Sequence, residues 1–305
     1  MSTTQEPSGV LIVNKTGGMT SHDVVNKIRR LFGTRRVGHT GTLDPLATGV
    51  LVVLVGRAAK ASEYLAADRK KYVATLRLGL TTDTEDITGK ILTESDEIPS
   101  KEAVFAVLPR FRGEIEQIPP MYSALKVGGR KLVDLARSGE TVERQARKIE
   151  IRSLEATETD DPREYILEVH CSGGTYIRTL CADIGAALGV GGVMATLERV
   201  ETSGFSLDQA HTLDELAALT EEERLAVLIP TEELFVSLEK LPLPAFYERL
   251  CRSGCEIYLK KLGRQLSVGE RVRLAREDGS FFALGEVCEY PDGLAVKAIK
   301  TFELE

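Results

Sequence analysis

The pattern of apolar and polar residues in the first 80 positions predicts strands joined by helices. Residues 9–14 and 50–55 are short apolar runs rich in β-branched side chains, which is typical of buried strands. Between them, Thr20 and Asp23 have the spacing of a capping box, and the apolar residues that follow recur at helical spacing. Residues 72–80 alternate between apolar and polar positions, which predicts a further strand with one buried face.

The rest of the chain continues this mixture and then changes character near residue 240. Further helices are predicted at residues 58–67, 100–110, 177–188 and 213–238, and further strands at residues 148–156 and 165–171. Pro242 and Pro244 mark a boundary. Short strands joined by Asp-Gly turn pairs follow it, at residues 271–275, 281–289 and 294–302. The pattern therefore predicts a large mixed α/β domain in residues 1–240 and a small β domain in residues 241–305.

Composition is that of an ordinary globular protein. The 305 residues are 43% hydrophobic, and no run of about 18 apolar residues offers a membrane span. The start of the chain lacks the charged and apolar regions of a signal peptide, so we expect a cytoplasmic protein without membrane contact. Five scattered cysteines predict reduced thiols. Cys251 and Cys255 are one pair where structural zinc needs four ligands, and the acidic loop at residues 81–89 lacks calcium-loop spacing, so we expect no metal.

Charge is sorted along the chain, which changes what the net charge of −7 implies. Residues 27–44 contain five basic residues and one acidic residue, and residues 126–148 contain seven basic residues and three acidic residues. By contrast, residues 83–102 and 214–240 are strongly acidic. A polyanion responds to the local field and not to the sum. The pattern fits a protein with one nucleic-acid-binding face, and it equally fits ordinary solvated helices.

The segment Gly38–Leu51, GHTGTLDPLATGVL, is the first candidate for chemistry. It places one carboxylate (Asp44), one imidazole (His39) and three glycines in a turn that runs into an apolar strand. Five cations between residues 27 and 36 precede the turn, so we expect a positive potential that keeps Asp44 ionised. The alternative is that Asp44 and the proline after it form an Asx turn with a structural role only.

Other catalytic patterns are missing from the sequence. It has no P-loop, no strand-linked Gly-x-Gly-x-x-Gly and no Gly-x-Ser-x-Gly elbow. The remaining candidates are Tyr72 at the start of a strand and Arg178 at the start of a helix. Both Tyr72 and Tyr176 have the alternative of being core residues. An arginine in a first helical turn opposes the helix dipole, which favours a carboxylate partner for Arg178.

Five motifs, in this order, resemble those of the TruB-type bacterial tRNA pseudouridine-55 synthases. They are NKTGGMTSHDVV, GHTGTLDPLATGVL, KKYVATLRLG, MYSALK and CSGGTYIRTL, and they span most of residues 9–200. Thr16 departs from the pattern, because the family usually has proline after this lysine and proline would fix the backbone φ. The segment VGERVRLAREDGSFFALGEV resembles a PUA domain, though less sharply.

The resemblance implies a fold and a reaction. The fold is of the α/β (α+β) class: a mixed, largely antiparallel sheet flanked by helices, with a basic thumb-like insertion at about residues 121–148 and a PUA-like C-terminal barrel. The reaction is isomerisation of uridine to pseudouridine in the tRNA T-loop, without cofactor or metal. The bond from the ribose to N1 breaks, the uracil turns, and C5 bonds to the ribose.

The same resemblance implies roles for individual residues. Asp44 is the catalytic carboxylate, and three roles stay open for it: addition to the ribose, addition to the base, or deprotonation of C2′. Tyr72 stacks on the target base and would assist proton removal from C5. Arg178 pairs with Asp44 and orients it. The residues expected to bind substrate are His39, Tyr176, Leu197, Asp86, Lys126, Arg130 and Lys131.

These binding residues divide by position. His39 occupies the space left by a flipped nucleotide or stacks on a displaced base. By the same resemblance, Tyr176 and Leu197 are expected to line the pocket. From its place in the acidic loop, Asp86 is expected to make a second carboxylate contact to Arg178. Lys126, with its neighbours in the insertion, contacts phosphates.

Two rival functions belong to other classes. An RNA-folding factor needs the basic face but not Asp44, so retained function without the carboxylate would favour it. A carboxylate-based hydrolase of small glycosides predicts binding that barely responds to salt. We expect the protein to act as a monomer with tRNA as its partner.

Overall fold

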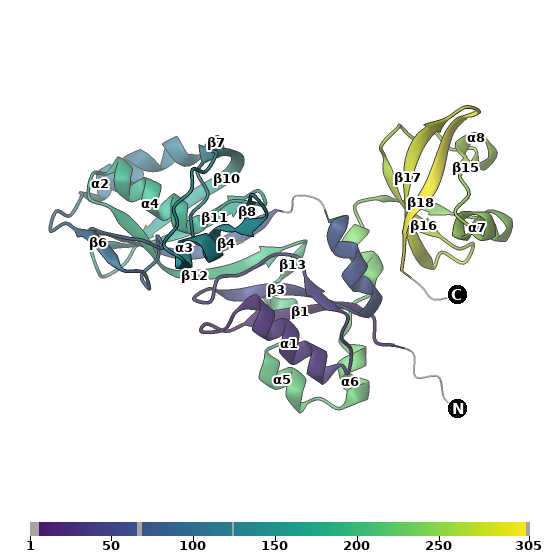
Figure 1. Ribbon diagram of the computed structural model, residues 1–305, viewed down its shortest axis with the longest axis horizontal. Coiled ribbons are helices and arrows are strands. Elements are labelled where there is room, and N and C mark those ends of the chain that lie inside the picture. The colour runs from purple at the N-terminus through teal and green to yellow at the C-terminus, as the bar shows by residue number, and fades with distance from the viewer. Residues whose placement is uncertain (1–5, 66–68, 124, 303–305) are drawn as a thin grey trace.

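The computed structural model describes residues 6–65, 69–123 and 125–302, which form a large sheet domain and a smaller C-terminal half-barrel (Figure 1). The large sheet has nine strands in the order β1-β3-β12-β4-β11-β10-β7, with β2 beside β3 and β13 beside β12. Pairing is antiparallel except between β3 and β12, so the expected mixed, largely antiparallel sheet is confirmed. The strands are β1 (Gly9–Lys15), β2 (Val37–His39), β3 (Thr48–Val55), β4 (Lys70–Leu78), β7 (Gly113–Gln117), β10 (Arg147–Glu158), β11 (Glu164–Cys171), β12 (Gly192–Thr202) and β13 (Phe205–Ser206).

Helices pack on this sheet and enclose its core. α1 (Ser21–Leu31) begins at the predicted capping box, in which Thr20 and Asp23 satisfy each other's backbone N–H groups. α4 (Ile177–Ala187) packs against β12 and β4, and α1 lies beside α5 (Leu213–Ala218) (Figure 1). The remaining helices are α2 (Lys101–Val107), α6 (Glu221–Ala226) and the short 3-10 helices η1 (Gly56–Glu63), η2 (Leu108–Phe111), η3 (Leu207–Gln209) and η4 (Thr231–Phe235).

Three predicted helices differ from those in the structure. The segment predicted at residues 58–67 is the 3-10 helix η1, and residues 66 and 67 lie outside the described residues. The helix predicted at residues 100–110 ends at Val107, and η2 carries Pro109 in its first turn. The long helix predicted at residues 213–238 is wrong. A second capping box at Thr220 starts a new helix, α6, after Leu219 has left helical backbone angles.

The strands β1 and β3 are buried on both faces, as their continuous apolar runs predicted. Leu11 and Leu51 face a core that includes α1, α4 and α5. Ile12 and Val52, whose side chains point the other way, join a second cluster that contains η1 and residues of the half-barrel. The strands β1 and β3 therefore connect the helical side of the large domain to the C-terminal domain.

The half-barrel begins at Glu239, two residues before the predicted boundary at residue 241. Its sheet has the order β14-β16-β17-β18-β15, and the two predicted Asp-Gly turns join β16 to β17 and β17 to β18. Its elements are β14 (Glu239–Pro242), α7 (Ala245–Arg252), β15 (Ile257–Tyr258), α8 (Leu259–Leu262), β16 (Arg271–Ala275), β17 (Phe281–Tyr290) and β18 (Gly293–Thr301).

Two small hairpins extend from the large domain. One consists of β5 (Leu80–Thr82) and β6 (Ile91–Glu94) in the acidic loop. The other consists of β8 (Lys126–Val127) and β9 (Arg130–Lys131), which lead into α3 (Leu132–Arg137). The second hairpin and α3 are the expected basic insertion with a short helix at its centre.

An aromatic cluster joins the two domains. The ring centroid of Phe302 lies 5.7 Å from that of Phe235 and 5.5 Å from that of Phe281. Leu284 of the half-barrel completes the cluster against apolar side chains of β1 and β3. Burial of this apolar surface stabilises the arrangement of the two domains.

We expect Phe302→Ala to lower the free energy of unfolding by about 3–5 kcal/mol, because it empties a buried aromatic site. Phe302 is 6% exposed, whereas Phe246 is 57% exposed. Phe246→Ala is the matched control and should change stability by less than about 0.5 kcal/mol. Urea unfolding of both variants measures the effect. Equal stability of the two would show that Phe302 does not hold the domains together.

Candidate active site

Most of the predicted site residues line one cavity of about 660 Å³ in the large domain, whereas Asp86, Lys126 and Arg130 lie outside its lining. Its lining includes Asp44 from the loop between β2 and β3, Tyr72 from β4, and Arg178 from the first turn of α4. His39, Tyr176 and Leu197 also line the cavity, and the basic insertion contributes Lys131. Residues separated by more than 150 positions in the sequence therefore line the same cavity. Ligand-binding and catalytic sites are usually concave in this way.

The loop that carries Asp44 is fixed mainly by backbone contacts. The Ser21 side chain accepts from Leu43 N at 2.8 Å and donates to Leu43 O at 3.1 Å. Gly18 N donates to Pro45 O at 2.9 Å, and Ala47 N donates to the main-chain oxygen of Asp44 at 3.1 Å. These contacts hold the turn and direct the Asp44 carboxylate at Arg178, so the turn is rigid and the side chain is available for chemistry.

Arg178 is the centre of the polar contacts. Its Nε lies 3.0 Å from Asp44 Oδ2, and its Nη1 lies 3.6 Å from Asp86 Oδ2. It also donates to Thr84 O at 3.0 Å and to Tyr122 O at 2.8 Å. The expected carboxylate partner of this arginine is present, and so is the second contact expected from Asp86. The Arg178 side chain is 5% exposed, so the surrounding protein holds it on nearly all sides. The Asp44 side chain is 34% exposed, so part of the carboxylate is open to the cavity.

Desolvation by the surrounding protein raises the pKa of Asp44 above its ordinary value of 3.8, and the nearby Asp86 raises it further. Arg178 and Lys15 oppose this rise. The direction is opposite to the expectation that flanking cations would favour the ionised form. Of the cations between residues 27 and 36, Arg29 donates to Val37 O at 3.2 Å and Arg36 pairs with Glu6. The charges that act on Asp44 come instead from other segments.

Lys15 is a site residue that the sequence reasoning missed. Its side chain is fully buried, and its Nζ donates to Met19 O at 2.8 Å and to Pro45 O at 3.3 Å. It thereby ties the glycine turn after β1 to the Asp44 loop. Burial lowers the pKa of Lys15 to about 8. A lysine that ends an apolar strand, in NKTGG, was the signal that could have found it.

Two aromatic residues lie where the sequence placed them, and one of them, Tyr72, is also a core residue. Burial raises the pKa of Tyr72, whose side chain belongs to the main core and also lines the cavity. Tyr176 immediately precedes α4, and its backbone N–H and C=O both bind the Gln117 side chain, at 2.8 and 3.0 Å. Gln117, buried at the end of β7, was not predicted. The core and site interpretations are therefore compatible for Tyr72, whereas Tyr176 lines the cavity without belonging to a core cluster.

His39 ends the short strand β2 and lines the cavity. Burial lowers its pKa, and the nearby Arg199 guanidinium lowers it further. The imidazole is therefore neutral at neutral pH. A neutral ring suits stacking or hydrogen bonding to a base more than pairing with a phosphate.

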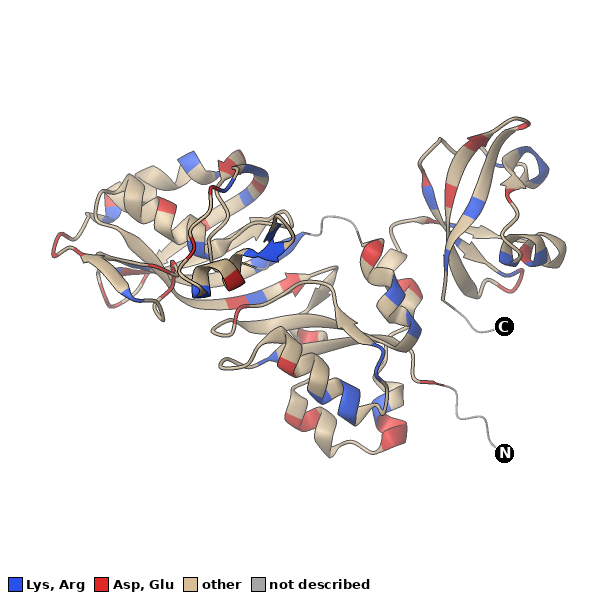
Figure 2. Ribbon diagram, in the orientation of Figure 1, with Lys and Arg blue, Asp and Glu red and all other residues tan. Residues whose placement is uncertain are grey.

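The basic insertion lies over this cavity, and Figure 2 shows its hairpin as a concentration of Lys and Arg. Lys126 and Lys131 are exposed on β8 and β9. Arg130 is bound by Glu140, with Nη2 2.9 Å from Oε1. The three cations are therefore not equivalent, because a phosphate would have to compete with Glu140 for Arg130.

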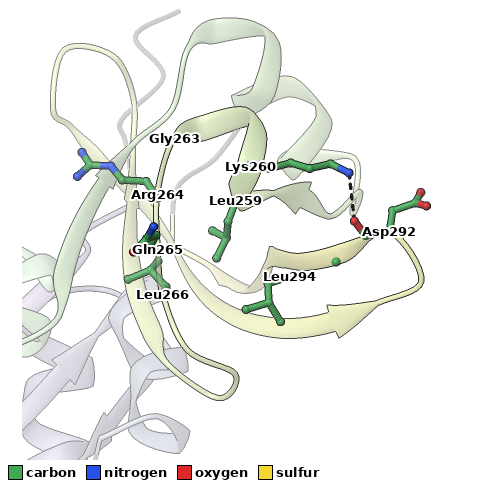
Figure 3. Close-up of a pocket in the computed structure, with 9 residues that line it drawn as sticks. Leu259, Lys260, Gly263, Arg264, Gln265, Leu266, Asp292 and Leu294 are labelled. Carbon is green, nitrogen blue, oxygen red and sulfur yellow. Dashed lines mark hydrogen bonds between the residues drawn. The ribbon is translucent and has the colours of Figure 1, made fainter.

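A second cavity, of about 560 Å³, lies in the half-barrel and is separate from the predicted site residues (Figure 3). In Figure 3, Lys260 reaches toward Asp292, and its Nζ donates to Asp292 O at 3.1 Å. Arg264 points away from that contact.

In the described ranges, no group of three or more His, Cys, Asp or Glu side chains is arranged to hold a metal ion. None of the helices in the described part of the chain is long and apolar enough to cross a membrane.

Comparisons with known proteins agree with the geometry. The sequence model of the TruB family pseudouridylate synthase N-terminal domain matches residues 29–177, and that of the tRNA pseudouridylate synthase B C-terminal domain matches residues 178–236. The chain is 45% identical over 251 residues to tRNA pseudouridine synthase B of Alkaliphilus oremlandii, covering 82% of this chain and 83% of that protein. It is 48% identical over 232 residues to the protein of the same name from Mycobacterium tuberculosis, covering 74% and 75%.

Among solved structures, the fold resembles that in a crystal structure of a Cbf5-Nop10-Gar1 complex. The TM-score is 0.71 at 26% sequence identity, and the likeness covers 97% of this chain and 85% of that chain. A structure of an H/ACA RNP bound to a substrate RNA containing 2′-deoxyuridine gives a TM-score of 0.73 at 23% identity, which supports the fold. Because adjoining family matches and relatives of nearly full length agree with one another, the chain belongs to the TruB family of pseudouridylate synthases.

Proposed function

We propose that this enzyme converts uridine to pseudouridine at position 55, in the T-loop of tRNA, and that Asp44 is its catalytic carboxylate. The observation that carries the proposal is the Asp44 side chain itself, partly open to a cavity and held from behind by the buried Arg178. The names of the relatives, tRNA pseudouridine synthase B, support tRNA as the substrate. Action as a monomer, which is expected from the sequence, stays a prediction.

The chemistry requires one bond to break and another to form at the same carbon. The bond between C1′ and N1 breaks, the uracil turns within the cavity, and C5 bonds to C1′. The proton on C5 then leaves and N1 takes up a proton, so the product is an isomer of the substrate. A fixed carboxylate suits each of the three open roles for Asp44, as nucleophile toward the ribose, nucleophile toward the base or base at C2′. Arg178 keeps the carboxylate oriented through the bond from Nε and stabilises its charged form.

The other cavity residues bind the nucleotide. Tyr72 presents its ring to the cavity, where it would stack on uracil and assist removal of the C5 proton. Tyr176 and Leu197 form further walls, and Asp86 acts through Arg178. Lys131 extends from the insertion toward the same space. Side chains in these positions would surround a uridine that has been flipped out of the RNA base stack.

The target uridine must be extruded from a folded T-loop, at a cost of a few kcal/mol for unstacking. A cavity of about 660 Å³ is large enough to receive the flipped nucleotide. His39, neutral at its side, would occupy the vacated space or stack on a displaced base. The insertion cations would hold the RNA backbone, and their contribution must fall with salt.

Asp44→Asn should lower tritium release from C5-labelled uridine in a T-loop hairpin by more than about 1,000-fold, since it removes the reacting charge. RNA binding should be nearly unchanged, because the side-chain volume is kept. Asp161→Asn, in the turn between β10 and β11, is the control and should retain activity. Turnover by Asp44→Asn would refute the catalytic assignment, and RNA remodelling without turnover would support an additional folding function.

In a plot of the single-turnover rate against pH, the fall in rate on the acid side, the acid limb, should reflect protonation of Asp44, whose pKa is raised above 3.8. Activity needs the carboxylate, so the rate should fall as the pH drops through that raised pKa. Asp86 is one of the groups that raise it, so Asp86→Asn should move the limb to lower pH. RNA binding measured at each pH is the control. A limb that stays in place, or moves upward, would contradict the assignment.

Replacing Lys126, Arg130 and Lys131 together with alanine should lower RNA affinity and flatten its salt dependence, by roughly 0.7–0.9 in log–log slope for each lost phosphate contact. Because Glu140 binds Arg130, the single change Lys131→Ala should weaken binding more than Arg130→Ala. Lys101→Ala, on α2, is the matched control. Binding titrations at several salt concentrations measure these effects, and unchanged binding by the triple variant would exclude the insertion as a clamp.

A further inference from the structure

Arg199 is a buried cation that none of the proposed steps uses. It lies in β12, and its residue is 1% exposed. At this point β12 runs between β3 and β4, so Arg199 is paired with Gly49 on one side and with Tyr72 on the other. The strand that carries Arg199 therefore separates the loop of the candidate carboxylate from the candidate aromatic residue.

The guanidinium group binds the Asp44 loop on both sides of the carboxylate. Nε donates to Val50 O at 2.8 Å, and Nη2 donates to Gly41 O at 3.1 Å. Gly41 precedes Asp44 and Val50 follows it. One rigid planar group thus fixes the distance between the two limbs of the turn.

The backbone at this point is also tightly packed. Gly49 has a φ of +98°, and a Cβ atom there would lie 2.3 Å from Arg199 O. Only glycine can adopt this conformation at so close an approach. The Asp44 loop is therefore pressed against the backbone of β12 as well as bound by the Arg199 side chain.

A buried arginine at position 199 is not expected to be the most stable choice of side chain for this part of the core. Nη1 of Arg199 is buried without a well-formed hydrogen bond among the described residues, although the Arg199 side chain also acts on the Tyr72 hydroxyl as a hydrogen-bond donor. Incomplete pairing of a buried charge lowers stability, and an apolar side chain of similar volume is often as stable or more so. The positive charge also opposes the rise in the pKa of Tyr72 that burial causes. A buried arginine here is better explained by what it does for the site.

We propose that Arg199 is a positioning residue that holds the Asp44 turn and the Tyr72 side chain in one fixed relation. The inference rests on the proposed function, since it assigns both of those residues to the reaction. Arg199 itself need not touch the substrate to affect the reaction. A displacement of about 1 Å of a reacting group, here Asp44 or Tyr72, can lower a rate by about 100-fold.

The test compares Arg199→Met and Arg199→Lys with the wild-type full chain. Wild type must first release tritium from C5-labelled uridine in a T-loop hairpin, and failure there would overturn the proposed function and not the positioning inference alone. We expect Arg199→Met to keep its melting temperature and its RNA affinity and to lower the single-turnover rate at saturating RNA by about 100-fold. Arg199→Lys, which keeps the charge and one donor group, should recover part of the rate.

Arg112→Met is the matched control. Arg112 also binds a backbone carbonyl with two donors, at 3.1 and 2.7 Å from Leu154 O, but it is not part of the cavity lining. Its variant should keep the single-turnover rate. Wild-type rates for Arg199→Met, or a loss of rate that only follows a loss of folded protein, would overturn the inference. Should Arg199→Met fail to fold, the rate of Arg199→Lys at saturating RNA decides, and a wild-type value there would overturn it too.

Discussion

The contact between a half-open carboxylate and a buried arginine is the interaction on which the site depends. Arg178 is held by the backbone oxygens of Thr84 and Tyr122 as well as by two carboxylates, so its position is set by three different loops. Burial alone would favour a neutral Asp44, and the arginine opposes that tendency. A fixed charge in a partly dry cavity interacts more strongly with developing charge than the same group would in water.

The same loops connect the site to the rest of the molecule. Tyr122 lies at the start of the basic insertion and Thr84 belongs to the acidic loop, so both segments contribute a backbone oxygen to the arginine that orients Asp44. The strand β3 leaves the Asp44 turn and then contributes one face to the helical core and the other to the cluster that contains Phe302. The rigidity of the turn thus depends on packing in both domains.

Much of the fold could be predicted because its signals are local. Continuous apolar runs predicted β1 and β3, alternation predicted β4, and Asp-Gly pairs predicted the hairpins of the half-barrel. The errors came from competing local signals. The acidic stretch at residues 213–238 had helical composition, but a second Thr-x-x-Glu capping box at Thr220 divided it. The candidate residues were found largely through the resemblance of five motifs to a known family.

The sequence by itself determined most of the strands and the first helix, because these follow from neighbours along the chain, and its motifs singled out Asp44 as the candidate carboxylate. Only the tertiary structure decided which charges surround that carboxylate. Lys15 and Arg199 lie in β-strands where a cation has no local explanation, and their contacts to Pro45, Gly41 and Val50 arise from strand pairing. Electrostatic environment depends on distances in space and on desolvation, and neither is encoded in spacing along the sequence.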